Sequence, residues 1–302
     1  MFKSKNSMSR ALVRRETTAG YLFLLPSLFF FVTFVLYPMF LCIYTSFFDS
    51  NMGKNAVDVF VGLGNYKELF QDKLFLGALK NTVVIVVVAV PTVCAFSLWV
   101  ATAIYDMKPA LTSAFRCIFY LPVVTGSVAV TVVWKWMSNS RYGVFNYLFK
   151  SLGIIDQNIN WLGDARFALW CIILILFTTS VGQPIVLYVS ALGNVDHSLV
   201  EAAQVDGANR RQVFWKIKWA QIMPTTLYIL IITTINSFQC FALIQLLTSG
   251  GPTHSTDTIM YYIYYTAFKL YRYGYGNAMG VVLMIIIAVL SAVQFKLGQQ
   301  SD

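Results

Sequence analysis

Six stretches of the chain contain no Asp, Glu, Lys or Arg, and each is at least 18 residues long. A helix needs about 20 mostly apolar residues to cross a bilayer, and a charge at the bilayer centre costs roughly 2.5–3.5 kcal/mol. Because these runs are continuous and do not alternate as barrel strands do, they predict transmembrane helices. The stretches are 17–48, 81–105, 117–134, 167–195, 219–256 and 273–295.

The composition points the same way, because only 12% of the residues are charged and 58% are hydrophobic. A soluble domain usually carries about 25% charged residues. We therefore predict an all-α polytopic membrane protein with six transmembrane helices. Its membrane domain covers residues 20–298, between an N-terminal tail (1–19) and a C-terminal tail (299–302).

Basic residues predict the orientation. If the N-terminus lies inside, the inside segments carry 12 of the 22 Lys and Arg residues in 63 positions, and the outside segments carry 10 in 94 positions. Positive residues accumulate on the cytoplasmic side, most strongly beside the first helix. We expect the protein to lie in the cytoplasmic (inner) membrane with both termini in the cytoplasm. The net charge of +9 is then explained by topology and not by nucleic-acid binding.

The sequence offers little for catalysis or metal binding. Its two His residues, His197 and His254, lie far apart, and no paired carboxylates or Ser-His-Asp set stands out. No G-x-x-x-x-G-K-[ST] phosphate loop occurs, so any ATP-driven work needs a separate ATPase chain. We predict a transport subunit without enzymatic activity, metal or cofactor.

The longest inside loop, 193–218, resembles two short helices separated by a glycine. Ser198 and Glu201 have capping-box spacing, which predicts a helix that begins at Leu199. Gly207 is placed to end that helix in a left-handed conformation. Residues 210–217 predict a second amphipathic helix beside the membrane. From the residues alone, an amphipathic surface pair without a partner is as acceptable as a docking element.

A family resemblance distinguishes these alternatives. Residues of this loop resemble the EAA loop of ABC importer permeases, although Met223 stands where a Leu usually precedes the proline. In that family the loop forms coupling helices that dock on the ATPase subunit. The resemblance implies this role for Glu201, Ala202, Ala203, Asp206, Gly207 and Ala208.

The resemblance extends over nearly the whole chain, from Leu25-Pro26 to Gln294-Phe295. The pattern is similar to the oligosaccharide subfamily, whose best-known member imports maltose, without that permease's large outside domain. It implies the ABC type I importer permease fold. The partners it implies are a second homologous permease, an ABC ATPase dimer and an extracytoplasmic solute-binding protein.

Polar residues within the charge-free stretches are candidates for the substrate pathway. Amides and hydroxyls beside aromatic rings bind sugars, although hydrogen bonds between helices are an equally common role. Alignment with the maltose permease implicates Thr233 and Ser237, and Gly182 more loosely. The chemistry of their side chains adds Gln183, Asn236 and Gln239.

We therefore expect the permease subunit of an ATP-driven importer for a neutral oligosaccharide delivered by a solute-binding protein. An importer of glycerol phosphate or another polar solute is the alternative within the family. An ion-coupled secondary transporter would need a buried ionisable residue, and the six stretches contain no Asp, Glu, Lys or Arg. A membrane-embedded enzyme would need catalytic groups that the scattered histidines do not supply.

Overall fold

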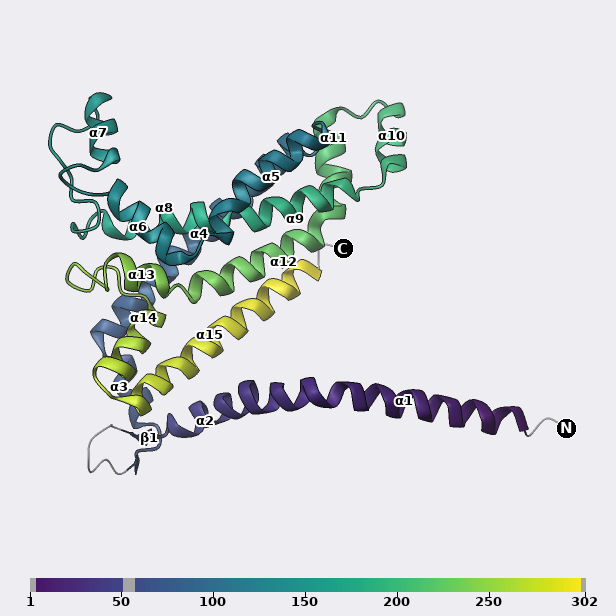
Figure 1. Cartoon of the computed structure of the whole chain (residues 1–302), viewed down its shortest axis with the longest axis horizontal. Coiled ribbons are helices and arrows are strands. Elements are labelled where there is room, and N and C mark those ends of the chain that lie inside the picture. The colour runs from purple at the N-terminus through teal and green to yellow at the C-terminus, as the bar shows by residue number, and fades with distance from the viewer. Residues whose placement is uncertain (1–3, 51–57, 300–302) are drawn as a thin grey trace.

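The computed structural model describes residues 4–50 and 58–299, and helices dominate this part of the chain (Figure 1). Two short strands, β1 (Phe48–Asp49) and β2 (Val59–Phe60), form an antiparallel ladder with Phe48 opposite Phe60. The first helical run is α1 (Ser4–Phe31), the π-helical turn η1 (Val32–Leu36) and α2 (Tyr37–Thr45). The others are α3 (Gly64–Gln71), α4 (Lys73–Ile104), α5 (Pro109–Val124), α6 (Ser127–Met137), α7 (Val144–Ser151), α8 (Ala168–Ser180), α9 (Gly182–Gly193), α10 (His197–Val205), α11 (Arg210–Val213), η2 (Phe214–Lys218), α12 (Trp219–Phe238), α13 (Ala242–Leu247), α14 (Ile259–Tyr264), η3 (Tyr265–Lys269) and α15 (Tyr273–Gln299).

Helix α4 is the centre of the bundle, because α9, α12 and α8 all pack on it. Its buried face includes Ile85, Val93 and Ala101, which are fully shielded from solvent. Tyr188 of α9 and Ile229 of α12 belong to the same buried cluster as Val93. These side chains recur at helical spacing, so one apolar stripe of α4 holds several helices together.

Three helical runs of the described residues are long and apolar enough to cross a membrane: Val13–Thr45, Lys73–Ile104 and Tyr273–Gly298. Two bent pairs, α5 with α6 and α8 with α9, raise the number to five. α12 lies in the remaining charge-free stretch, but its Thr, Asn and Ser side chains interrupt its apolar run. The all-α membrane fold is confirmed, and α12 is the helix at the remaining charge-free stretch.

Neither the third nor the fourth charge-free stretch forms one straight helix. α5 and α6 meet at 95°, because Thr125 is extended and Gly126 offers no side chain to the helix. α8 and α9 meet at 41° at Val181, just before Gly182-Gln183-Pro184. Since proline lacks an N–H group, Pro184 is suited to the first turn of a new helix.

The first helix stands apart from the rest of the described chain (Figure 1). None of the apolar window between Val13 and Thr45 is buried, and only its end, α2, packs on α15. There Asn277 donates from Nδ2 to Thr45 Oγ1 at 2.7 Å. The predicted tail at 1–19 is helical from Ser4 onward and continuous with α1, whereas residues 1–3 and 300–302 lie outside the described residues.

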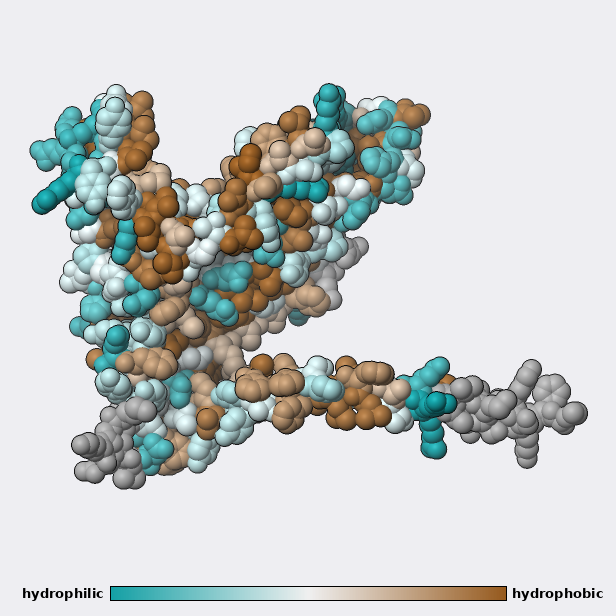
Figure 2. Space-filling model, viewed as in Figure 1, coloured by the Kyte–Doolittle hydropathy of each residue, from teal (hydrophilic) through white to brown (hydrophobic). Residues whose placement is uncertain are grey.

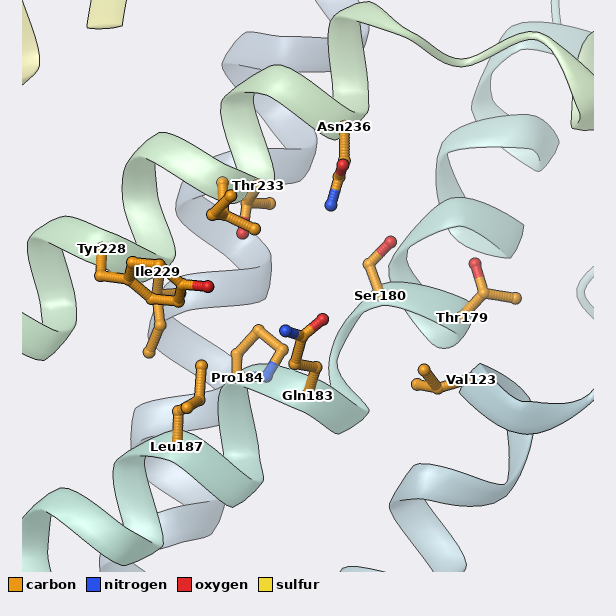
Figure 3. A pocket seen from close by; sticks show the side chains of 11 residues that line it. Val123, Thr179, Ser180, Gln183, Pro184, Leu187, Tyr228, Ile229, Thr233 and Asn236 are labelled. Carbon is orange, nitrogen blue, oxygen red and sulfur yellow. The ribbon is translucent and has the colours of Figure 1, made fainter. Parts of the chain in front are cut away.

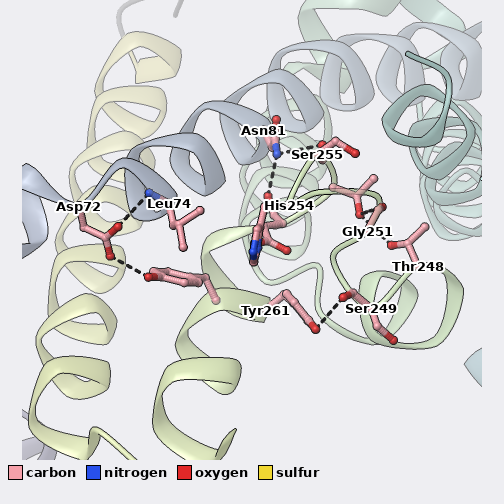
Figure 4. Close-up of polar contacts among 12 residues, drawn as sticks. Asp72, Leu74, Asn81, Thr248, Ser249, Gly251, His254, Ser255 and Tyr261 are labelled. Atoms are coloured by element: carbon pink, nitrogen blue, oxygen red, sulfur yellow. Dashed lines mark hydrogen bonds and ion pairs between the residues drawn. The ribbon is translucent and has the colours of Figure 1, made fainter. Parts of the chain in front are cut away.

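A tight loop that contains Gly250-Gly251-Pro252 reverses the chain after α13. The Gly251-Pro252 peptide is cis, and Gly250 has a φ of 83°. Asn81 of α4 holds this loop by donating to the backbone carbonyls of Ser255 and Asp257, at 3.1 and 3.0 Å (Figure 4). The loop is therefore fixed to the start of α4.

Asp72 joins three helices at the same end of the molecule (Figure 4). Its carboxylate caps α4 by accepting from the Leu74 N–H at 2.8 Å. It also accepts from the hydroxyls of Tyr262 in α14 and Tyr275 in α15, at 2.7 and 2.9 Å. Burial would raise the pKa of Asp72, but these hydrogen bonds outweigh it and leave the pKa below its ordinary value.

Replacing Asp72 with Ala should lower the free energy of unfolding by about 2 kcal/mol, since a helix cap and two hydrogen bonds to a charged group disappear together. Thermal unfolding in detergent measures the loss. Asp164→Ala is the control, because Asp164 and Arg166 form an exposed pair that should contribute little. Equal melting temperatures for the Asp72→Ala variant and the unchanged protein would contradict this role.

Candidate functional site

A pocket of about 160 Å³ opens where α8 bends into α9, opposite α12 (Figure 3). The bend carries Gln183 into the space between α9 and α12, and Asn236 faces it from α12 (Figure 3). All of the lining side chains are uncharged. They are Val123, Thr179, Ser180, Gln183, Pro184, Leu187, Tyr228, Ile229, Ile232, Thr233 and Asn236.

Helical periodicity explains which side chains reach the pocket. Tyr228, Ile232 and Asn236 follow one another at intervals of four on α12, so they form one stripe. Gln183 and Leu187 repeat the interval on α9. The pocket wall therefore alternates hydrogen-bonding groups with apolar surface.

The structure brings together only half of the predicted pathway residues. Gln183, Thr233 and Asn236 line the pocket, whereas Gly182, Ser237 and Gln239 do not. Ser237 is buried within the bundle, and Gln239 is exposed where α12 ends.

Gly182 has a packing role. A Cβ at this position would lie 2.3 Å from the backbone carbonyl oxygen of Phe119 in α5. A glycine therefore allows α9 to approach the α5 backbone closely where the bend begins.

Sequence reasoning missed Thr179, Ser180 and Tyr228, which also line the pocket. A signal was present, because Thr178-Thr179-Ser180 is a polar run directly before the Gly-Gln-Pro bend. Tyr228 could have been found from its interval of eight residues to Asn236. Pro184 favours a break at this point, but the direction in which the bend turns the end of α8 could not be read from residue types.

The predicted coupling loop projects from the bundle as α10 (Figure 1). No residue of α10 is buried, and the side chains of Leu199 and Val205 are 50% and 87% exposed. Glu201 and Ala202 are exposed, and Ala203 is half-buried. An exposed helix with apolar side chains and small alanines offers a surface for close contact with another protein.

The start of α10 differs from the prediction. Asp196, not Ser198, caps the helix, and its carboxylate accepts from the Ser198 N–H at 2.9 Å. The helix therefore begins at His197, and the predicted Ser198–Glu201 capping box does not form. Aspartate at this position is a strong cap because an ionised carboxylate also favours the helix N-terminus.

The end of α10 follows the prediction. Gly207 has a φ of 83°, the left-handed conformation that glycine adopts readily. The Gly207 N–H bonds to the carbonyl of Gln204, and the Ala208 N–H bonds to that of Ala203, at 3.1 and 2.9 Å. These two bonds form a Schellman motif. Asp206 and Ala208 thus belong to the helix end that precedes the next helix.

The sequence predicted a separate second surface helix in this loop, but the structure does not contain one. α11, η2 and α12 follow each other without a gap from Arg210 to Phe238. Asn209 and Gln212 form the capping box at its start. Gln221 of α12 also accepts from the Asp196 N–H at 3.0 Å, so the base of α12 holds the start of α10.

Comparison with known proteins now gives the family. Residues 21–299 match the model of the binding-protein-dependent transport system inner membrane component. The chain belongs to this family. It is a permease subunit of an ABC importer, a membrane transport protein and not an enzyme.

The alignments with curated relatives cover almost the full length of this permease. The chain is 33% identical to the probable ABC transporter permease YesP of Bacillus subtilis over 94% of this chain and 91% of that protein. It is 32% identical to the lactose transport permease LacF of Rhizobium radiobacter, with 94% and 95% covered. A solved bacterial alginate importer chain shares the fold at 23% identity, with a TM-score of 0.81 and 97% and 99% covered.

Substituting Gly182 with Ala should separate α9 from α5 in this permease. The added Cβ has no room beside Phe119, and overpacking of this kind costs about 1–3 kcal/mol. Gly193→Ala is a matched control at the other end of α9, where a Cβ would meet nothing within 4 Å. Thermal unfolding of both variants tests the claim, and equal stability would contradict it.

Proposed function

We propose that this permease translocates a neutral oligosaccharide through a pathway that includes the pocket between α8, α9 and α12. One observation carries the proposal: the pocket has hydrogen-bonding and aromatic side chains and no charged one. Amides and hydroxyls can donate to and accept from sugar hydroxyls, and the ring of Tyr228 offers an apolar face. A neutral sugar leaves no buried charge unpaired.

The size of the pocket supports a partner subunit. Ligand sites usually measure about 300–1,000 Å³, whereas this pocket has about 160 Å³. We propose that a second, homologous permease completes the pathway from the other side. The unburied first helix, which leaves its own bundle, gives such a partner a large apolar surface.

We propose that α10 and the Gly207 turn bind an ABC ATPase dimer. Glu201, Ala202 and Ala203 lie on this projecting helix, and Asp206 to Ala208 form its end. The exposed Leu199 and Val205 would lose their contact with water in such a complex. The absence of a phosphate-loop sequence agrees with an ATPase on a separate chain.

We propose that the protein lies in the cytoplasmic membrane with both termini and α10 in the cytoplasm, as the distribution of Lys and Arg favours. A solute-binding protein would then dock on the opposite face, where α7, α13 and α14 lie (Figure 1). A solved alginate importer contains a periplasmic protein bound to an alginate pentasaccharide, which supports this arrangement.

Glycerol phosphate is the second candidate substrate, because the chain is 28% identical to the sn-glycerol-3-phosphate permease UgpA of Agrobacterium fabrum, covering 91% of this chain. A phosphate is best held by Arg or Lys. Neither residue lines the pocket, so the sugar is favoured.

Uptake by the reconstituted importer should be strong for a labelled di- or trisaccharide and weak for glycerol phosphate. Gln183→Ala and Asn236→Ala should each raise the KM for the sugar about 5- to 100-fold, as expected when a hydrogen bond of about 1–3 kcal/mol is lost. Ser237→Ala, outside the pocket, is the control. Import of glycerol phosphate without import of any sugar would reject the oligosaccharide proposal.

Gly207→Val should disconnect the permease from the ATPase. A β-branched residue in the left-handed conformation costs about 1–2 kcal/mol, and no neighbouring atom lies within 4 Å of an added Cβ. The turn should therefore rearrange, and both ATPase recruitment and sugar-stimulated ATP hydrolysis should fall.

Gly153→Val is the matched control, because Gly153 has a φ of 69°, open space around it and a position in the loop after α7. It should lose similar stability but keep ATPase recruitment. Normal ATPase stimulation in the Gly207→Val variant would remove the coupling role that we assign to this turn.

A further inference from the structure

A second, larger hollow lies along α12, between α4 and α15, and has a volume of about 610 Å³. We call it the α4–α15 groove. It shares no residue with the pathway pocket, because the side chains of α12 that line it belong to another face of the helix. Its α12 floor consists of Trp219, Met223, Thr226, Leu227 and Leu230.

The walls of the α4–α15 groove are mostly apolar. α4 contributes Pro91, Ala95 and Leu98, and α15 contributes Leu297 and Gly298 together with one polar side chain, Gln294, whose Nε2 donates to Thr234. The hydroxyl of Thr226 already donates to the carbonyl of Ile222 at 3.1 Å. This surface is suited to a hydrocarbon chain and poorly suited to a sugar.

One end of the groove has a different character. Trp215 and Trp219 both line it, with ring centroids 5.5 Å apart. Tryptophan pairs of this kind mark the level of the lipid headgroups. The end of the groove thus lies at a membrane surface, on the same turn that connects the coupling loop to α12.

Two lysines belong to this turn. Lys218 contacts the hydroxyl of Tyr105 and lies 4.5 Å from the centroid of its ring. Lys216, next to Trp215, is exposed and forms no ion pair within the described residues. Lys216 directly follows Trp215, so its charge lies at the level of the tryptophan pair that ends the groove, and a positive charge there is complementary to a lipid phosphate.

We propose that the α4–α15 groove binds one anionic phospholipid, with an acyl chain along α12 and its phosphate at Lys216. The lipid would contact the base of α12, the segment that joins the coupling loop to the pathway pocket. The inference requires the membrane location that the family establishes, and it depends on the proposed orientation only for the identity of the leaflet.

The test uses the whole importer in phosphatidylcholine nanodiscs that contain a trace of photoreactive lipid. A diazirine in the acyl chain of phosphatidylglycerol should label peptides of α4 and α12 that line the groove. The corresponding phosphatidylcholine probe should label them about fivefold less, since one lysine near the surface contributes about 1 kcal/mol to binding of an anionic lipid. Sugar transport is not measured, so failure here is distinct from failure of the proposed function.

Variants separate the site from ordinary boundary lipid. Lys216→Gln should abolish the preference for phosphatidylglycerol, whereas Lys150→Gln, an exposed lysine on α7, should leave it intact. Ala95→Trp should fill the groove and abolish labelling there, while Val87→Trp, exposed elsewhere on α4, should not. Melting temperatures confirm that each variant is folded.

Two results would overturn the proposal. Equal labelling by the two lipids, unchanged by Lys216→Gln, would show a groove filled by any bilayer lipid. Cross-linking of an Ala95→Cys variant to another subunit, without lipid labelling, would show that a protein helix occupies the groove.

Discussion

Backbone hydrogen bonding in lipid is the constraint on which the rest of this structure depends. A bilayer core offers no water to an unpaired N–H or carbonyl group, so a chain that crosses it must be helical. Helices α4 and α15 satisfy this condition along their full length, and hydrophobic residues cover much of the face of the bundle that Figure 2 shows. A helix break is then costly unless the protein itself surrounds it. The bend between α8 and α9 is such a place, because α5 and α12 cover it.

The same bend produces the candidate pathway. An uninterrupted helix would continue the direction of α8 past α12. Ending α8 at Ser180 and restarting at Gly182 instead turns Gln183 and Pro184 toward the α12 stripe. Gly182 permits this because α9 begins in close contact with the backbone of α5. The polar pocket is therefore a consequence of one local break and one close helix contact.

Much of this architecture was predictable, because helices, turns and helix breaks depend on local features: stretches without charge, glycines and prolines. The six charge-free stretches each correspond to helical structure, and the left-handed turn lies at Gly207, as the residue type indicated. The break before Pro184 lies where a proline is suited to begin a new helix. Three features escaped prediction for physical reasons. Asp196 caps α10 in place of Ser198, since either side chain could accept a hydrogen bond from the first N–H groups of a helix that starts here. The 95° angle between α5 and α6 follows from the extended backbone of Thr125 and Gly126, a conformation that the residue types did not indicate. Burial of Ser237 and exposure of Gln239 depend on which face of α12 meets α4, whereas their residue types are equally polar.

The continuity of α11, η2 and α12 links the two candidate sites mechanically. Asn209 caps the helical run just after the Gly207 turn, and Asn236 lies near its other end, in the pocket. At a rise of 1.5 Å per residue, the run between these residues is about 40 Å long. A motion of α10 that crosses the Gly207 turn would therefore reach Tyr228, Thr233 and Asn236 within one continuous helical run. Gln221 strengthens the connection by holding the backbone of Asp196. A rigid element that spans both sites is the kind of device through which a packed helix shift transmits a change of state. The two separate surface helices that the sequence suggested would have needed a flexible joint at Lys218, and the observed helix has none.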